Sequence, residues 1–190
     1  MEVNLGFLVD GSKNVHQQNF AALLETVKYI YSAFPISRHD VRVGLGIIST
    51  NPEVIFRFDK YFTKTQIDMA VNDVDYPGSG SAAHVGKALT AAKDLFYGTG
   101  NRKRVRKVLV VLLGGKYLDD VTEPIKTLRD SNVEVFCIAI GNNLDSTYLT
   151  TVASMPTSLH SVVTDYDTLA EGALETIKKL EIAKVKYSKL

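Results

Sequence analysis

The sequence predicts an α/β protein with a doubly wound, Rossmann-like sandwich: a mostly parallel six-stranded sheet, one antiparallel edge strand, and helices on both faces. Three segments are nearly unbroken apolar runs rich in β-branched residues, which is typical of strands covered on both faces. They are Val3–Val9, Lys107–Leu113 and Val133–Ile140. Amphipathic helical patterns separate these runs, and strands that alternate with helices form parallel sheets. The length of 190 residues and the hydrophobic content of 45% suit one domain with a substantial core.

Three further segments complete the expected sheet. Val41–Ile48 is apolar but contains two glycines, and the turn-forming stretch Ser49–Pro52 follows it. Val54–Phe58 comes next, so the two segments can form a hairpin whose second strand runs antiparallel at one edge. Leu159–Val163 is expected to be a short sixth strand.

Helices are expected where apolar residues recur three, four and seven positions apart. The first spans Phe20–Phe34 and is stopped by Pro35. The last spans Leu169–Ile177, with Asp167 or Thr168 as its cap. Between these two, helices are expected over Val85–Phe96, Val121–Leu128 and Tyr148–Val152.

The composition excludes several classes of protein. The formal net charge is +1, whereas a dedicated nucleic-acid binder is strongly basic. No apolar run has the roughly 18 residues that a membrane-spanning helix needs. The single cysteine, Cys137, excludes a disulfide framework and an all-cysteine zinc site, and its place within a strand predicts an inert, buried thiol. We assign residues 1–180 to one domain and residues 181–190 to a helix extension or a linker tail.

The loops between strands and helices lack the motifs of known catalytic sites. The first strand ends in Val9–Asn14, which offers one glycine and a carboxylate where a dinucleotide-binding loop needs several glycines. No Gly-x-Ser-x-Gly motif occupies a strand-to-helix turn. The histidines are scattered, and His84 suits the first turn of a helix better than the role of a base. We therefore predict that the chain is not an enzyme.

One loop does carry residues of the type that binds hard metal ions. Asp10, Ser12 and Asn14 place alternate oxygen-bearing side chains after the first strand, and Mg²⁺ and Ca²⁺ take oxygen ligands. In doubly wound sheets the ligand site lies at the carboxyl ends of the central strands. The same side chains can instead brace the turn and cap the first helix. The other two loops at this edge, residues 78–83 and 114–120, decide between these interpretations.

A series of short motifs runs through the chain in a fixed order: Leu5–Ser12, Val41–Leu45, Val85–Leu89, Lys107–Leu112 and Val133–Phe136, the last ending in Ile140-Gly141. With these motifs the chain resembles the von Willebrand factor A-type domain over essentially its whole length. Within that family it is most similar to the matrix subgroup, in particular the N-terminal A-domain repeats of the collagen VI alpha-3 chain.

The resemblance also implies where a metal site would lie. Family members with a working site carry Asp-x-Ser-x-Ser on the first loop, a Thr on the second and an Asp on the third. Asp10 and Ser12 match, but Asn14, Ala83 and Gly114 stand at the other positions. A methyl group cannot bind a metal, glycine offers no carboxylate, and Mg²⁺ sheds its water reluctantly. We therefore expect a degenerate site with no cofactor and at most weak Mg²⁺ binding.

The resemblance implies a secreted extracellular-matrix module for protein–protein interaction and microfibril assembly, excised from a longer chain. Its expected partners are matrix proteins or neighbouring A-domains of the same chain, with no nucleic acid and no membrane insertion. Tyr76, Tyr117 and Asp119 lie near the rim of the degenerate site and are candidate contact residues. The tyrosines can equally pack over loop bases, and Asp119 can stabilise the start of the next helix.

Two alternatives stay open. In the first, the Asp10–Ser12–Asn14 loop still holds a metal that captures an acidic ligand, which would make the chain a metal-dependent adhesion domain. In the second, the chain is an intracellular scaffold, because no signal peptide precedes the first strand.

Five cations within six residues precede the fourth expected strand: Arg102, Lys103, Arg104, Arg106 and Lys107. Such a run binds an anionic polymer such as heparan sulfate through salt-dependent contacts. The alternative is an ordinary solvated connection at the end of the sheet opposite the metal-type loops.

Overall fold

The strands form one mixed sheet. The computed structural model describes residues 2–78, 83–97, 102, 104–141 and 146–187. Within these residues the strand order is β3-β2-β1-β4-β5-β6, and every neighbouring pair is parallel except β2 and β3. The predicted doubly wound sheet with one antiparallel edge strand is therefore confirmed. The strands are β1 Val3–Asp10, β2 Val41–Ile48, β3 Glu53–Phe56, β4 Arg106–Leu113, β5 Val133–Ile140 and β6 Ser161–Thr164.

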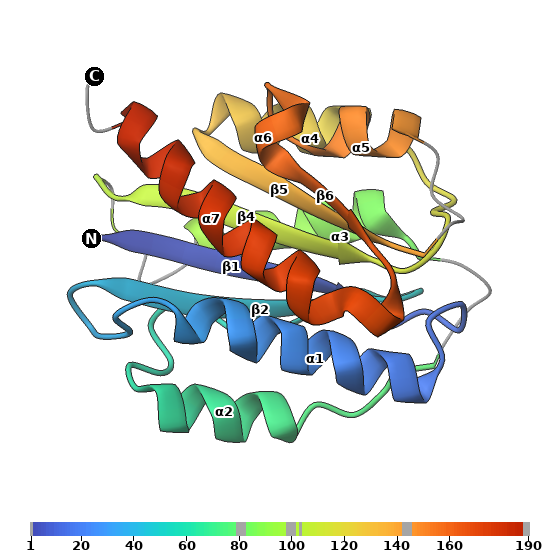
Figure 1. Cartoon of the computed structure of the whole chain (residues 1–190), viewed down its shortest axis with the longest axis horizontal. Helices are drawn as coiled ribbons and strands as arrows, with labels where there is room; N and C mark the ends of the chain where they lie inside the picture. Colours follow the sequence, from blue (N-terminus) through green and yellow to red (C-terminus); the bar gives the residue numbers. More distant parts are fainter. Residues whose placement is uncertain (1, 79–82, 98–101, 103, 142–145, 188–190) are drawn as a thin grey trace.

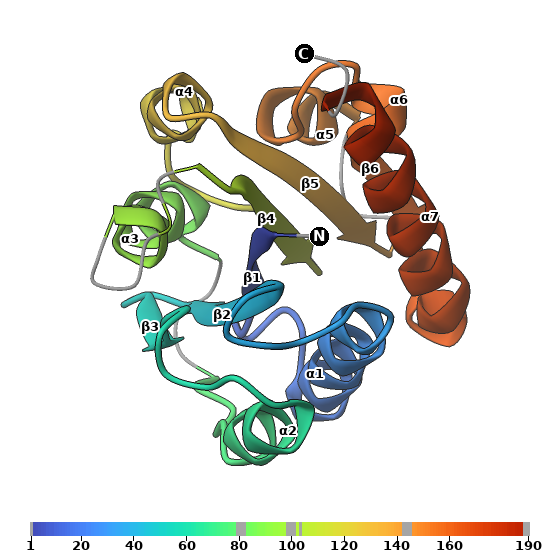
Figure 2. The same cartoon turned by 90° about the vertical axis from the view of Figure 1, so that its left-hand side faces the viewer.

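Helices cover both faces of this sheet (Figure 1). The helices are α1 Gln17–Ser32, α2 Lys64–Asn72, α3 Val85–Tyr97, α4 Thr122–Asp130, α5 Ser146–Val152, α6 Thr157–His160 and α7 Leu169–Tyr187, with a 3-10 turn η1 at Tyr166–Thr168. Figure 2 shows α1 and α7 on one side of the sheet, and α3 and α4 on the other. In the part of the chain that the structure describes, no helix is both long and apolar enough to cross a membrane.

Each face of the sheet has its own hydrophobic core, because successive strand residues point to opposite faces. Phe7 and Val110 belong to the cluster under α1 and α7, whereas Leu8 and Leu109 belong to the cluster under α3 and α4. Cys137 lies in the second cluster, and burial raises the pKa of its thiol to about 12, so the thiol is an apolar core group.

Three local expectations differ from the structure. Helix α2 was not expected, because only Ile67 and Val71 on it are buried and the apolar pattern is too sparse to stand out. Thr63 begins this helix by accepting a hydrogen bond from the backbone N–H of Gln66. The sixth strand begins later than expected, since Leu159 lies in α6. Before α7, Asp165 and Thr168 form a reciprocal capping box on η1, so Thr168, one of the two expected cap residues, takes part together with Asp165, which was not expected.

Candidate functional site

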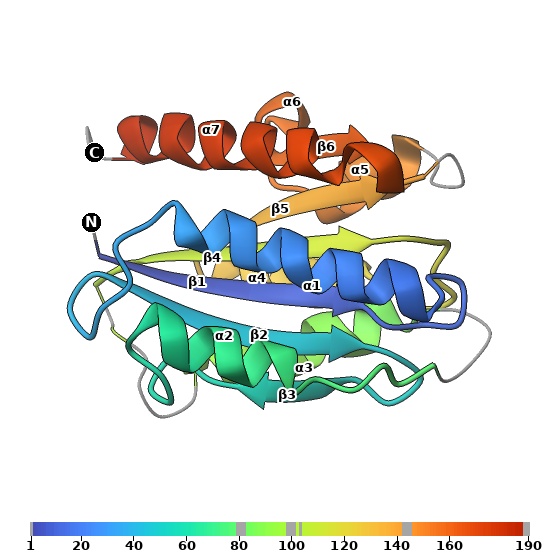
Figure 3. The ribbon, with the colours of Figure 1, turned by 60° about the horizontal axis from the view of Figure 1, so that its bottom comes forward.

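Strands β1 and β4 are neighbours, and both end at the edge of the sheet away from the two chain termini (Figure 3). Asp10 is the last residue of β1 and is 0% exposed. One oxygen of its carboxylate accepts a hydrogen bond from the backbone N–H of Ser12 at 3.0 Å, and the other accepts one from the N–H of Gly114 at 3.1 Å. Burial raises the pKa of Asp10 above its ordinary value of 3.8, and the backbone donors offset only part of this effect.

Ser12 is equally buried, and its side chain interacts with the carboxylate of Asp10, whose pKa it lowers. Its backbone carbonyl accepts a hydrogen bond from the hydroxyl of Tyr76 at 3.1 Å. The ring of Tyr76 lies against Phe20, with the ring centroids 5.4 Å apart. Tyr76, a candidate contact residue, thus ties the first loop to α1.

Gly114, at the end of β4, has no room for a side chain. A Cβ atom placed there would lie 2.3 Å from the hydroxyl oxygen of Tyr166 and 2.8 Å from a methyl of Val15. Tyr166 begins the η1 turn that leads into α7, and its hydroxyl is buried without a hydrogen-bond partner in the described structure. Burial raises the pKa of this phenol to about 12. Tyr166 therefore fills the space that a carboxylate at position 114 would need, and sequence reasoning did not identify it.

The remaining two positions of the metal-type pattern, Asn14 and Ala83, differ in burial. Asn14 is exposed, and a Cβ on Gly115 would lie 3.1 Å from the Cβ of Asn14, so the two loops pass close together. Ala83 is fully buried and carries only a methyl group. Its backbone pairs with Tyr117 in an isolated bridge, which joins the second loop to the third.

Asp119 reinforces this junction between loops. Its two carboxylate oxygens accept hydrogen bonds from the backbone N–H groups of Gly86 at 3.0 Å and Lys87 at 2.8 Å, at the start of α3. Asp120 instead accepts from the N–H of Thr122 at 2.9 Å, at the start of α4. The expectation that Asp119 stabilises the following helix is therefore wrong, because Asp119 caps the preceding helix and the following helix is served by Asp120.

The third loop also presents Leu118, which sequence reasoning missed, beside the predicted contact residue Tyr117. Tyr117 is half-buried, with its ring 4.4 Å from that of Tyr148, and burial raises the pKa of its hydroxyl to about 12. Leu118 beside it is 69% exposed. A leucine within an otherwise polar stretch after a buried strand was the available signal.

The arrangement described above is found in a known protein family: three loops and the buried Asp10 lie at the carboxyl ends of the neighbouring strands β1 and β4. The family profile of the von Willebrand factor type A domain aligns with residues 4–177. The chain belongs to the von Willebrand factor type A domain family. The resemblance predicted from its motifs is thereby confirmed.

Relatives of this A domain include extracellular matrix proteins. The mouse collagen alpha-4(VI) chain is 32% identical over 137 residues, which cover 72% of this chain and 6% of the relative. The mouse collagen alpha-1(XX) chain is 30% identical over 168 residues, covering 86% of this chain and 13% of the relative. Human matrilin-1 is 26% identical over 178 residues, covering 93% and 36%. The chain therefore spans only a small part of each of these proteins.

Solved A-domain structures share the fold. A structure of proximal thread matrix protein 1 from the mussel byssus, with a zinc-occupied MIDAS motif, matches with a TM-score of 0.86 and 18% identity over 94% of this chain and 48% of that chain. A manganese-loaded Plasmodium vivax TRAP protein matches with a TM-score of 0.74 and 16% identity, covering 94% and 72%. At this identity the likeness establishes the fold alone.

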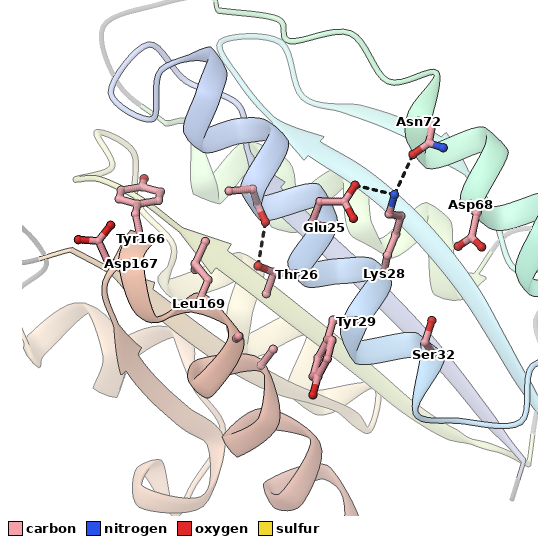
Figure 4. Close-up of a pocket in the computed structure, with 13 residues that line it drawn as sticks. Glu25, Thr26, Lys28, Tyr29, Ser32, Asp68, Asn72, Tyr166, Asp167 and Leu169 are labelled. Atoms are coloured by element: carbon pink, nitrogen blue, oxygen red, sulfur yellow. Dashed lines mark hydrogen bonds and ion pairs between the residues drawn. The ribbon is translucent and has the colours of Figure 1, made fainter.

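A groove of about 840 Å³ lies between α1, α2 and α7 of this A domain (Figure 4). Within it Lys28 forms an ion pair with Glu25 at 2.5 Å and donates a hydrogen bond to Asn72 at 2.9 Å. Tyr166 lines one end of the groove, so the side chain that fills the space beside Gly114 also contacts the cleft between α1 and α7.

The basic run lies at the opposite end of the sheet, and its first arginine is bonded internally. The guanidinium of Arg102 donates to the side-chain oxygen of Asn4 at 2.9 Å. It also donates to the backbone carbonyls of Val3, His39 and Asp40 at 2.7–2.8 Å. These bonds join the starts of β1 and β2, a role that the sequence interpretation did not assign.

Arg106 is bonded internally as well. Its Nε and one Nη donate to a single carboxylate oxygen of Glu134 at 2.8 and 2.6 Å, and its other Nη donates to the carbonyl of Leu180 on α7 at 3.0 Å. The second carboxylate oxygen of Glu134 lies 2.8 Å from Nε2 of His160. Glu134 and His160 were also missed, although a glutamate in an otherwise apolar strand indicates a buried partner.

The other members of the run differ in their surroundings. Arg104 is exposed. Lys107 is half-buried and donates to the carbonyl of Ser131 at 3.4 Å. Lys103 lies outside the described residues. The five cations therefore do not form one uniform surface stripe.

Proposed function

We propose that this A domain is a non-enzymatic interaction and assembly module of the extracellular matrix whose partner contact needs no divalent cation. The observation that carries the proposal is the state of Asp10. Its carboxylate is buried and both oxygens already accept backbone hydrogen bonds, so a cation would have to share this single carboxylate with the Ser12 and Gly114 N–H groups. Mg²⁺ is held by anionic oxygens that replace part of its water shell, and no second carboxylate stands beside Asp10 in the described structure.

The position of Tyr166 supports the same proposal. Its hydroxyl lies where a side chain on Gly114 would project, and it begins the turn into α7. A carboxylate side chain at position 114 would have to move this tyrosine and, with it, the start of α7. We therefore propose that α7 keeps one position when Mg²⁺ is added.

The partner surface that we propose is the set of exposed side chains around the closed site: Asn14, Lys116 and Leu118. Leu118 supplies apolar area, and Lys116 and Asn14 supply a polar rim, which is the usual arrangement of a small interface. The candidate contact residues from the sequence support this surface, because each holds a loop in place; they are Tyr76, Tyr117 and Asp119. The partners are matrix proteins or neighbouring A domains of the same parent chain.

Calorimetric titration with Mg²⁺, Mn²⁺ and Ca²⁺ tests the cation independence, with the melting temperature followed in parallel. We expect no saturable heat and no change in melting temperature, because a ligand that binds only the folded state raises its apparent stability. Saturable binding that is lost in Asp10→Ala would overturn the proposal.

The second candidate, a metal-dependent adhesion domain, is favoured by one observation: the side chains of Asp10 and Ser12, two oxygen ligands of the metal-type pattern, are both buried and interact with each other after β1. The two candidates are separated by measuring binding to immobilised collagen VI with EDTA and with Mg²⁺. The proposed function predicts equal binding in both buffers. Binding that requires Mg²⁺ supports the adhesion domain.

The same assay tests the partner surface. We expect Leu118→Ser to weaken binding about tenfold, because it removes the exposed apolar group of the contact. Met69→Ser is the matched control, since Met69 is similarly exposed but lies on α2. Equal binding by both variants would place the contact elsewhere on the domain.

A further inference from the structure

The amino ends of β4 and β5, the end of α4 and the segment after α5 enclose a cavity of about 510 Å³. It lies at the end of the sheet opposite Asp10, so it is separate from the site described above. The residues that line it include Arg106, Lys107, Arg129, Asn132, Ser154 and Met155.

Arg129 is the least neutralised charge of this cavity. One Nη of its guanidinium donates to the carbonyls of Thr151 at 2.9 Å and Ala153 at 2.5 Å, which fixes the plane of the group. Its Nε is buried and has no hydrogen-bond partner in the described structure. Among the described residues no carboxylate pairs with Arg129, and the neighbouring Asp130 pairs with Lys126 at 2.9 Å.

The carboxylate that does lie in the cavity wall is already used. One oxygen of Glu134 takes two hydrogen bonds from Arg106, and the other faces His160. Glu134 therefore balances the charge of Arg106, and it does not pair with Arg129. Arginine binds oxyanions through its planar fork of N–H donors, and such charge-assisted hydrogen bonds are stronger than neutral ones.

We propose that this cavity binds a tetrahedral oxyanion, a sulfate group, with Arg129 as its principal donor. The volume exceeds what one sulfate ion fills, and Met155 at the rim is 73% exposed, so the cavity also admits a sulfate carried on a larger molecule. Free inorganic sulfate and the sulfate ester of a polysaccharide are the two sources of this group. The sulfate site does not depend on the state of Asp10, so the sulfate titration and the test of the proposed function can fail independently of each other.

The test is a titration of the whole domain with sodium sulfate, followed by NMR chemical shifts, against sodium chloride at equal ionic strength. We expect saturable shifts around residues 105–107, 129–134 and 154–155 with sulfate only. Arg129→Gln is expected to weaken sulfate binding about tenfold or more, because it removes the charged donor. Lys126→Gln, with the same loss of charge on an exposed part of α4, is the control and should keep the affinity of the original domain.

A second variant covers the case in which Arg129→Gln unfolds the loop that it holds. Met155→Glu places a carboxylate at the rim without touching Arg129, and it should weaken sulfate binding by a similar factor, whereas Met155→Gln should not. The proposal is overturned if sulfate acts no differently from chloride, or if a folded Arg129→Gln or Met155→Glu variant keeps its affinity. Displacement of bound sulfate by a heparin-derived oligosaccharide, but not by its desulfated form, would assign the site to a sulfate ester. Absence of displacement by either would assign it to the free anion.

Discussion

Two buried carboxylates stand at opposite ends of the sheet, and their pKa values are shifted in opposite directions. Asp10 ends β1, and burial raises its pKa, because the hydrogen bonds from Ser12 and from the Gly114 N–H offset burial only in part. Glu134 lies at the start of β5, where burial alone would raise its pKa. The hydrogen bonds and charges of His160 and Arg106 outweigh burial there and lower it.

The comparison separates two uses of a buried charge. At the Glu134 end the carboxylate bonds to the guanidinium of Arg106 on β4 and to the ring of His160 on α6, and the same arginine also reaches α7, so the cluster holds several elements together. At the Asp10 end the fold tolerates an acidic group without a cationic partner, which costs stability. Removing the charge of Glu134 should therefore cost far more stability than removing the charge of Asp10.

The largest effect is expected from Glu134→Gln. It leaves the buried guanidinium of Arg106 without its counter-charge, and breaking a buried ion pair in this way costs about 3–5 kcal/mol of unfolding free energy. Urea unfolding measures the change. Asp130→Asn, which breaks an exposed ion pair with Lys126, serves as the control and should leave stability unchanged. A similar small loss in both variants would mean that the Glu134 cluster is not a structural centre.

Arg102→Gln should give the next largest effect. The side chain donates to three backbone carbonyls and to Asn4, and losing these bonds should cost about 2 kcal/mol. Arg104→Gln, an equal loss of charge at an exposed position, should leave the urea midpoint where it is. If both variants were equally stable, the basic run would be a solvated surface after all.

At the Asp10 end, Gly114→Ala should cost about 1–3 kcal/mol, because the new methyl overlaps the hydroxyl of Tyr166. Tyr166→Phe removes that oxygen, and the next ring atom, Cζ, lies 3.5 Å from the Cβ position. The double variant should therefore recover part of the loss, with the contact to Val15 accounting for the remainder. A double-mutant cycle by thermal unfolding measures this coupling, and strictly additive losses would contradict it.

These clusters also mark what sequence patterns predict and what they leave out. Unbroken apolar runs and helical periodicity gave the sheet and most helices, because the core on each face imposes those periods. Helix α2 was not predicted, since it buries only Ile67 and Val71. Tyr166 was not predicted for a different reason. Its role depends on the absence of a side chain at Gly114, which is distant in the chain, and no local sequence pattern indicates such a pair.

The pH dependence of stability should separate the two carboxylates further. Because the pKa of Glu134 in the folded state lies below its ordinary value of 4.5, its stabilising effect is complete above that pH and is lost as the pH falls through the lowered pKa. Glu134→Gln should therefore lose less stability than the original domain on acidification below pH 4.5. Unfolding free energies across this acid range measure the difference, and parallel curves would show that Glu134 titrates normally in the folded state.

The smallest effect concerns how firmly the loops at the Asp10 end are held. Asp119→Ala removes the carboxylate that accepts from the N–H groups of Gly86 and Lys87, and losing such a cap costs about 1 kcal/mol. Hydrogen exchange at these two amides should accelerate, whereas Asp120→Ala should leave them protected because Asp120 bonds to Thr122 instead. If exchange at Gly86 and Lys87 were unchanged in Asp119→Ala, the backbone bridge between Ala83 and Tyr117 would suffice to hold the second loop. Faster exchange would mean that this edge is kept in one conformation by a side chain, the carboxylate of Asp119, in addition to the backbone bridge.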